Sequence, residues 1–234
     1  MKYKIIQSGS DGNCTVVDNR IAIDIGVPWY RMERFVPDLK LVLCTHEHGD
    51  HFNRRTVRTL ARKRPTIRWA CGEWMAEHLI GAGVDRRNVD VLEMGSWYKY
   101  RIGDDEWISV SAFETQHDTR NCGWRLYKDQ FDTLFYATDL GNLDGIRAKC
   151  YKVYLLEANH TEAELERRME EKLDAGDFAY ETRVAETHLS MEQAAEWLRE
   201  NMAPESIWIP MHQHKEREAR QNAQPTDKGN DQNF

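Results

Sequence analysis

The stretch Leu41–Phe52, LVLCTHEHGDHF, begins with a short apolar run and continues with four potential metal ligands in six residues. Such an apolar run is typical of a buried central strand. The four ligands are His46, His48, Asp50 and His51. Imidazole and carboxylate groups hold Zn²⁺ and similar divalent ions, and a loop that leaves a strand can gather them around one point. The stretch therefore predicts a metal site at the end of a strand.

This stretch resembles the H-x-H-x-D-H signature of the metallo-β-lactamase-fold hydrolases, and further motifs of that family follow in its order. Each of their polar residues comes after a strand-like segment. They are Asp24 in IAIDIG, His117 at the end of WISVSAFETQH, Asp139 in LFYATDLG and His212 in SIWIPMHQH. The resemblance covers residues 3–214 and implies an α/β fold, the four-layer αββα sandwich. We expect one such hydrolase domain over residues 1–214.

The resemblance also implies a centre of two divalent ions. One ion is expected on His46, His48 and His117. The other is expected on Asp50, His51 and His212, with Asp139 bridging the two and Asp24 bracing the ligand loop from behind. His214 is the alternative to His212. A hydroxide that bridges the ions would be the nucleophile, oriented by Asp50. Zn²⁺ is the expected metal and Mn²⁺ the alternative, since both accept nitrogen and oxygen ligands.

A narrower resemblance concerns SGSDGNC near the start, LLEANH at 155–160 and HLS at 188–190, which look like the YycJ-type branch. That branch is related to the tRNase Z and RNase J nucleases. Glu157 and His188 fall where tRNase Z-like enzymes carry a glutamate and a histidine that help to protonate the leaving group. His160 belongs to the same motif, either close behind the metals or as a core residue.

The function that follows is a dinuclear metal-dependent phosphodiester hydrolase, either a nuclease or a cyclic-nucleotide phosphodiesterase. Residues 53–68 carry six Arg and one Lys without an acid, although the net charge of the chain is -7. Arg54, Arg58 and Arg62 share one face of a predicted helix, which either steers phosphate or is a solvated surface. This face favours a nucleic acid, whereas the short chain without an added substrate arm favours a compact nucleotide.

Two other functions stay open. A hydrolase of thioesters, lactones or β-lactams on the same fold would not need His188 to protonate a phosphate ester. A non-catalytic binding module is disfavoured because every expected metal ligand is present. The eight Trp residues are expected mainly in the core or at interfaces, although one or two could stack on a base.

Composition and the chain start suggest a cytoplasmic protein. The 234 residues are 41% hydrophobic and 30% charged, which excludes collagen-like, disulfide-scaffold and wholly disordered chains. No stretch approaches the roughly 20 apolar residues of a membrane helix, and the start lacks the apolar run of a secretory signal. The five Cys are odd in number and scattered, as in a reducing compartment. Residues 215–234 predict a disordered tail, and a homodimer is left open beside a monomer.

Hydrophobic periodicity predicts helices interleaved with short strands. Strands are expected over residues 2–7, 14–17, 21–25, 41–45, 67–70, 97–102, 106–114, 123–128, 131–137, 153–157 and 206–210. Helices are expected over 54–63, 73–80, 161–173 and 190–201, the last with Ser190 as N-cap and Gln193 three residues later. Consecutive strands in the middle and helices around them favour two packed sheets between helices.

Overall fold

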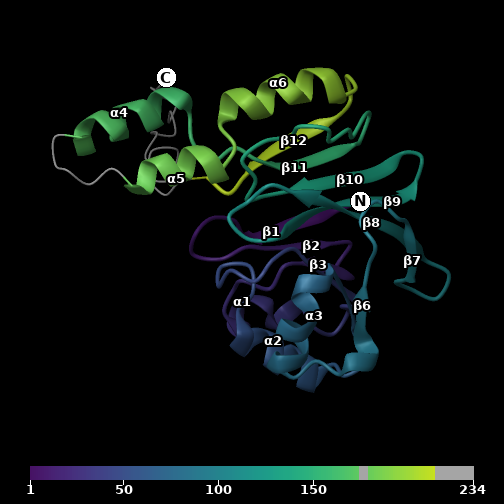
Figure 1. The fold of residues 1–234 in the computed structure, drawn as a ribbon. Helices are drawn as coiled ribbons and strands as arrows, with labels where there is room; N and C mark the ends of the chain where they lie inside the picture. Colours follow the sequence, from purple (N-terminus) through teal and green to yellow (C-terminus); the bar gives the residue numbers. More distant parts are fainter. Residues whose placement is uncertain (174–178, 214–234) are drawn as a thin grey trace, which may run out of the picture.

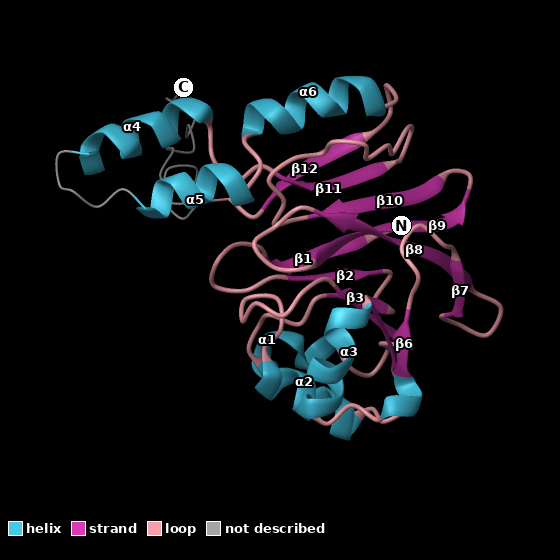
Figure 2. Ribbon diagram, in the orientation of Figure 1, coloured by secondary structure: helices cyan, strands magenta, loops and turns pink. Residues whose placement is uncertain are grey.

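The computed structural model describes residues 1–173 and 179–213, which form two six-stranded sheets between helices (Figures 1 and 2). The expected αββα sandwich is confirmed. The predicted tail over 215–234 lies outside the described residues. None of the helices in the described part of the chain combines the length and the apolar character that a membrane crossing requires.

The first sheet has the strand order β1-β2-β3-β4-β5-β6. Its strands are β1 (Tyr3–Gln7), β2 (Cys14–Val17), β3 (Ile21–Ile23), β4 (Leu41–Cys44), β5 (Arg68–Cys71) and β6 (Val89–Val91). β1 to β3 are antiparallel and β3 to β6 are parallel. Asp18 and Asn19, which join β2 to β3, have φ of 48° and 56°. Positive φ at both central residues is what a tight hairpin turn requires.

The second sheet has the order β12-β11-β10-β9-β8-β7. Its strands are β7 (Tyr98–Arg101), β8 (Trp107–Thr115), β9 (Asn121–Asp129), β10 (Asp132–Ala137), β11 (Val153–Glu157) and β12 (Ile207–Met211). β7 to β10 are antiparallel, and β10, β11 and β12 are parallel. The carboxyl ends of the parallel strands therefore meet at one edge of the sheet.

The apolar strands are buried on both faces, which explains their composition. In β4, Leu41 and Leu43 pack between the two sheets, whereas Val42 and Cys44 pack under the helices of the first sheet. β11 does the same on its side of the sandwich, because Leu155 lies between the sheets and Leu156 faces the helical layer. A strand between two cores has no face left for polar side chains.

Three helices and two short 3₁₀ turns cover the first sheet, and one helix covers the second (Figure 2). The three are α1 (Trp29–Met32), α2 (Arg54–Lys63) and α3 (Glu73–Ala82), with turns η1 (Glu33–Phe35) and η2 (Arg86–Asn88). α6 (Met191–Asn201) covers the second sheet and starts with the predicted capping box of Ser190 and Gln193. α3 ends at Gly83, whose φ of 103° suits glycine.

Two further helices, α4 (Glu162–Leu173) and α5 (Ala179–Thr187), extend sideways from the sandwich (Figure 1). The helix over 161–173 is confirmed as α4. The sequence did not indicate α5, because ETRVAET has no sustained apolar stripe. The strand β6 and the four-residue α1 were not predicted either, since such short segments are held by their neighbours rather than by their own periodicity.

We expect the core between the sheets to dominate stability. Leu126→Ala removes a fully buried side chain of β9 from this core and should lower the free energy of unfolding by about 2–5 kcal/mol. Tyr127→Ala, on the opposite face of the same strand and 41% exposed, should cost about 1 kcal/mol or less. Urea denaturation followed by fluorescence measures both, and equal losses would contradict the assigned core.

Candidate metal centre

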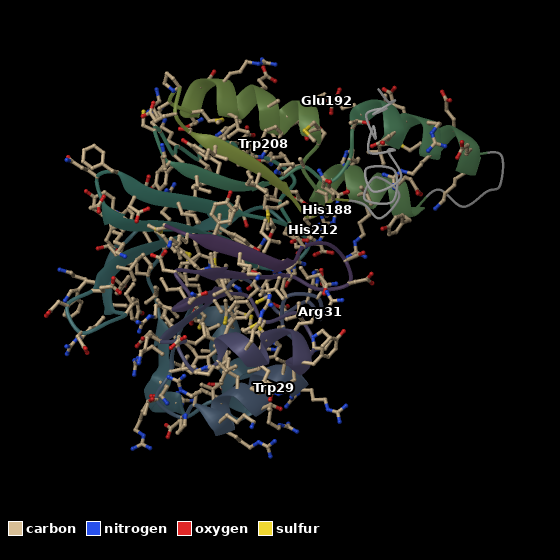
Figure 3. All side chains as sticks on the ribbon, turned by 180° about the vertical axis from the view of Figure 1, so that it is seen from behind. Trp29, Arg31, His188, Glu192, Trp208 and His212 are labelled. Carbon is tan, nitrogen blue, oxygen red and sulfur yellow. The ribbon has the colours of Figure 1, made fainter. Side chains whose placement is uncertain are left out.

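The predicted ligands lie at the ends of strands from both sheets. His46 follows β4 of the first sheet, while His117, Asp139 and His212 follow β8, β10 and β12 of the second. Figure 3 shows His188 beside His212 at the edge from which α4 and α5 extend. Because the strands end at a common edge, residues 166 positions apart in the chain, from His46 to His212, converge on one place.

Three imidazoles form the first group of candidate ligands. His46, His48 and His117 each offer a nitrogen, and these atoms lie within 4.8 Å of one another. Their ring centroids are 4.8–5.3 Å apart. The buried Nε2 of His46 has no hydrogen-bond partner, and the buried Nε2 of His117 makes no hydrogen bond although Asp118 Oδ1 lies 3.1 Å away. Buried polar atoms normally have partners, so these orphaned nitrogens fit a divalent cation.

The second group lies beside the first and combines carboxylates with imidazoles. Asp50, His51, Asp139 and His212 offer ligand atoms within 4.8 Å of one another. His51 Nε2 lies 2.8 Å from Asp139 Oδ2. His212 Nε2 lies 3.4 Å from the other oxygen of Asp139 and 3.5 Å from Asp50 Oδ2. The His46 and His51 rings are 4.2 Å apart, so the two groups adjoin.

A shared pattern of hydrogen bonds orients four of these imidazoles. In each, Nδ1 is engaged away from the centre, which leaves Nε2 available. The partners are Thr45 Oγ1 for His46 (3.0 Å), Asp24 Oδ2 for His51 (2.8 Å), the Thr187 carbonyl for His117 (3.1 Å) and Glu157 Oε1 for His212 (3.2 Å). Such supporting contacts fix ring orientation in metal sites. The arrangement fits a metal centre better than a hydrogen-bonded core.

Asp24 is buried behind the ligand loop, where the resemblance placed it. Its carboxylate accepts hydrogen bonds from the Thr45 N–H and the Thr45 hydroxyl, both at 2.9 Å, besides its contact with His51. Because Thr45 in turn contacts His46, one carboxylate supports a histidine in each ligand group. Replacement of Asp24 would therefore loosen both groups.

The pKa values of His46 and His51 are shifted in opposite directions, because burial dominates at His46 and neighbouring carboxylates dominate at His51. Burial, reinforced by the neighbouring His51, keeps the pKa of His46 well below its usual value, so this imidazole is neutral as metal ligation requires. Burial also opposes the charge on His51, but Asp139 and Asp24 outweigh it and raise the pKa of His51 to about 10. A metal ion at Nε2 would have to displace that proton.

Glu157 is fully buried and lies between two histidines. Its Oε1 is 2.8 Å from His188 Nδ1 and 3.2 Å from His212 Nδ1, while Oε2 accepts the Leu140 N–H at 2.9 Å. Burial opposes the charge on His188, but Glu157 outweighs it and raises the pKa of His188. The pair resembles an oriented proton donor. Asp139, Glu157, His188 and His212 also form a third group of possible ligands.

Backbone conformation at the site departs from ordinary strand ends. Asp24, Asp139 and His212 have φ of 58°, 57° and 52°. Non-glycine residues adopt this left-handed region at some cost, which the surrounding contacts must offset. Gly26 packs against the Asp50 backbone so closely that a Cβ atom would lie 1.6 Å from the Asp50 carbonyl oxygen. The ligand loop is therefore fixed by its neighbours.

Two residues at the site were not predicted. Asp118 Oδ1 lies 3.1 Å from His117 Nε2 and 3.5 Å from His48 Nε2. Asn13, in the SGSDGNC motif, has its amide nitrogen 3.1 Å from Asp50 Oδ2 and 2.8 Å from His51 Nε2. Two signals in the sequence could have pointed to them, because Asp118 directly follows His117 and Asn13 lies in the SGSDGNC motif.

The other residues that the sequence singled out lie away from the ligand groups or outside the residues that the structure describes. His160 is buried, and its ring contacts Asn159 rather than a ligand. Arg54 and Arg58 donate hydrogen bonds to the Gly81 and Ala82 carbonyls at the end of α3. These hydrogen bonds give Arg54 and Arg58 a structural role that involves no phosphate. Phosphate steering by Arg54, Arg58 and Arg62 stays a prediction. His214 lies outside the described residues.

Comparisons with known proteins agree with this architecture. Exodeoxyribonuclease WalJ of Streptococcus pneumoniae is 28% identical over 176 residues, which cover 68% of this chain and 62% of WalJ. Exodeoxyribonuclease YycJ of Bacillus anthracis is 26% identical over 176 residues, covering 68% of this chain and 63% of YycJ. The match thus spans less than two thirds of the length of either relative.

Solved structures show the same fold at low identity. The short form of human tRNase Z superposes with a TM-score of 0.64 at 14% identity, covering 93% of this chain and 94% of that one. The metallo-beta-lactamase fold protein YhfI of Bacillus subtilis gives 0.66 at 12% identity, covering 94% and 90%. The family described as "Beta-lactamase superfamily domain" matches residues 21–213. The chain therefore belongs to the beta-lactamase superfamily, which confirms the resemblance seen in its motifs.

Proposed function

We propose that this protein is a metal-dependent hydrolase of phosphodiester bonds in nucleic acid, with DNA as the first candidate substrate. The observation that carries the proposal is the pair of adjoining ligand groups, whose His46 and His51 rings lie 4.2 Å apart, with His188 held by Glu157 beside the second group. Relatives named as exodeoxyribonucleases support DNA as the substrate.

His46, His48 and His117 would hold one divalent ion, and Asp50, His51 and His212 would hold the other. Asp139, which lies in the second group, is the proposed bridge. Such ions supply Lewis acidity, lower the pKa of water and neutralise charge on a phosphoryl group. Zn²⁺ suits this histidine-rich set, and Mn²⁺ is the alternative.

The chain itself contributes orientation and proton transfer. Asp50 has an oxygen directed to the second group, next to His212 Nε2, where it can orient an attacking water as well as bind metal. His188 donates a proton to the leaving oxygen, because Glu157 holds its Nδ1 and raises its pKa. General acid catalysis of this kind is worth about 10²–10⁴-fold in rate.

The first prediction concerns metal content. The zinc-loaded protein should hold about two ions per chain, as a two-metal site requires. Asp139→Ala removes the residue common to two of the ligand groups and should lower that content to one ion or none, measured by plasma mass spectrometry after dialysis. His78→Ala, an exposed histidine on α3, is the control and should keep the full content. One ion per chain in the unaltered protein would contradict a dinuclear centre.

The substrate class is tested by hydrolysis of a panel. Single-stranded DNA and RNA, a cyclic mononucleotide, bis(p-nitrophenyl) phosphate, a thioester and a lactone are compared with Zn²⁺ or Mn²⁺ added. We expect metal-dependent cleavage of the phosphodiesters, with DNA preferred, and loss of activity in His46→Ala. Turnover of the thioester or lactone alone would favour the alternative hydrolase, and preference for the cyclic nucleotide would replace the nuclease.

The role of His188 is tested by comparing two substrates, one with a leaving group that needs a proton and one with a leaving group that does not. His188→Asn should slow DNA cleavage by about 10²–10⁴-fold, whereas bis(p-nitrophenyl) phosphate should lose far less, since its leaving group needs no proton. Metal content should be unchanged. Equal losses on both substrates together with lost metal would make His188 a ligand, and unchanged activity on DNA would remove it from the mechanism.

A further inference from the structure

Two arginines lie at the edge of the metal centre, next to the first ligand group. Arg183 belongs to α5, and Arg120 follows the ligand His117 by three residues. Their side chains are 63% and 57% exposed. We call these two residues the arginine rim.

Arg183 is joined to the ligands through Asp118. Its guanidinium pairs with Asp118 Oδ2, while Asp118 Oδ1 lies 3.1 Å from His117 Nε2. The same helix supplies the Thr187 carbonyl that contacts His117 Nδ1 at 3.1 Å. α5 is therefore attached to one metal ligand at two points, and Arg183 is held at its exposed surface.

Arg120 is held in a different way. Its guanidinium carbon lies 4.5 Å from the centre of the Trp74 ring. Trp74 is itself fixed, because its Nε1 donates to the carbonyl of Thr45, the residue before His46. Thr119 donates to Glu47 Oε1 at 2.6 Å, which ties this segment to the ligand loop. A stacked guanidinium keeps its N–H groups directed outward for bidentate contacts with anions.

Space for a ligand adjoins this position. A pocket of about 460 Å³ lies beside Arg120, a volume within the range of small-molecule sites. Trp74, Val91, Leu92, Met94 and Tyr98 line it together with Arg120, and Glu73 and Glu93 also lie in its wall. The aromatic side chains offer a stacking surface for a base, and Arg120 is the cation in the wall that a phosphate could approach.

Arg120 and Arg183 pair with the carboxylates of Glu114 and Asp118, whereas three arginines in the helical layer of the first sheet donate to backbone carbonyls. Arg54 and Arg58 donate to backbone carbonyls at the end of α3, and Arg64 donates to the Val36 and Leu39 carbonyls. These contacts stabilise the helical layer of the first sheet. The chain as a whole carries a net charge of -7, so binding of a polyanion requires cations concentrated at the site.

We propose that Arg120 and Arg183 bind backbone phosphates of a single-stranded nucleic acid beside the bond that is cleaved. The proposal rests on the proposed function and specifies which surface holds the substrate. Asp118 and Trp74 are positioning residues that hold the two guanidinium groups in place. Because each arginine contacts phosphate rather than base, the rim binds strands of any sequence.

Fluorescence anisotropy of a labelled DNA decamer tests the rim. The zinc-loaded full chain carries His188→Asn in every sample to slow cleavage, and Arg120→Ala and Arg183→Ala are added singly. Each should weaken binding about fivefold at low salt, as the loss of one exposed ionic contact predicts. Each should also reduce the slope of log affinity against log salt by about 0.7, the value for one phosphate on a single strand. Arg120→Lys and Arg183→Lys should retain the slope.

Arg87→Ala is the matched control, because it also breaks an exposed Arg–Asp pair, with Asp85, but at the opposite end of α3 from Trp74. It should change neither affinity nor slope, and metal content should stay constant in all variants. Unchanged binding in both rim variants would overturn the proposal while leaving the nuclease intact. A parent protein that holds zinc but neither binds nor cleaves nucleic acid would overturn the proposed function instead.

Discussion

Burial of three carboxylates where the two sheets meet is the constraint on which the site depends. Asp24, Asp139 and Glu157 are all 3% exposed or less. A buried carboxylate is unfavourable unless charge and hydrogen bonds compensate it, and here imidazoles supply both. Each carboxylate contacts at least one histidine: Asp24 and Asp139 contact His51, and Glu157 contacts His188. Strands from both sheets must end at this point to place these partners, so the ligand cluster and the register of the sandwich are inseparable.

Much of this arrangement could be predicted because its signals are local. Buried strands such as Leu41–Cys44 and Val153–Glu157 have continuous apolar composition and can be predicted from it. The candidate ligands that directly follow such strands are thereby placed at the edge of the sheet. The left-handed backbone at Asp139 could not be predicted, since it is imposed by long-range contacts. The contact of Glu157 with His212 as well as His188 likewise joins strands that are far apart in sequence.

Two arginines of the basic run have structural partners, and phosphate steering by this run stays a prediction. The basic run over 53–68 is concentrated in sequence, yet Arg54 and Arg58 are directed to the carbonyls at the end of α3. Those carbonyls carry the partial negative charge of a helix carboxyl terminus, which favours cations. The arginines next to the ligands, Arg120 and Arg183, are isolated in sequence and have no pattern to reveal them. Folding brings Arg183 beside His117, whereas Arg120 follows that histidine by three residues.

The position of α5 connects the proposed substrate contact of Arg183 with the candidate metal ligand His117. Within six residues it supplies Arg183, the carbonyl of Thr187 and the adjoining His188. The carbonyl fixes the orientation of His117, and His188 is held by Glu157, which also contacts a ligand of the second group. A phosphate bound at Arg183, as proposed, would therefore act on the helix whose Thr187 carbonyl contacts His117 and which leads directly into His188. Because these contacts lie on one helix and the residue after it, binding of a nucleic-acid strand and alignment of the proposed catalytic groups are expected to be coupled.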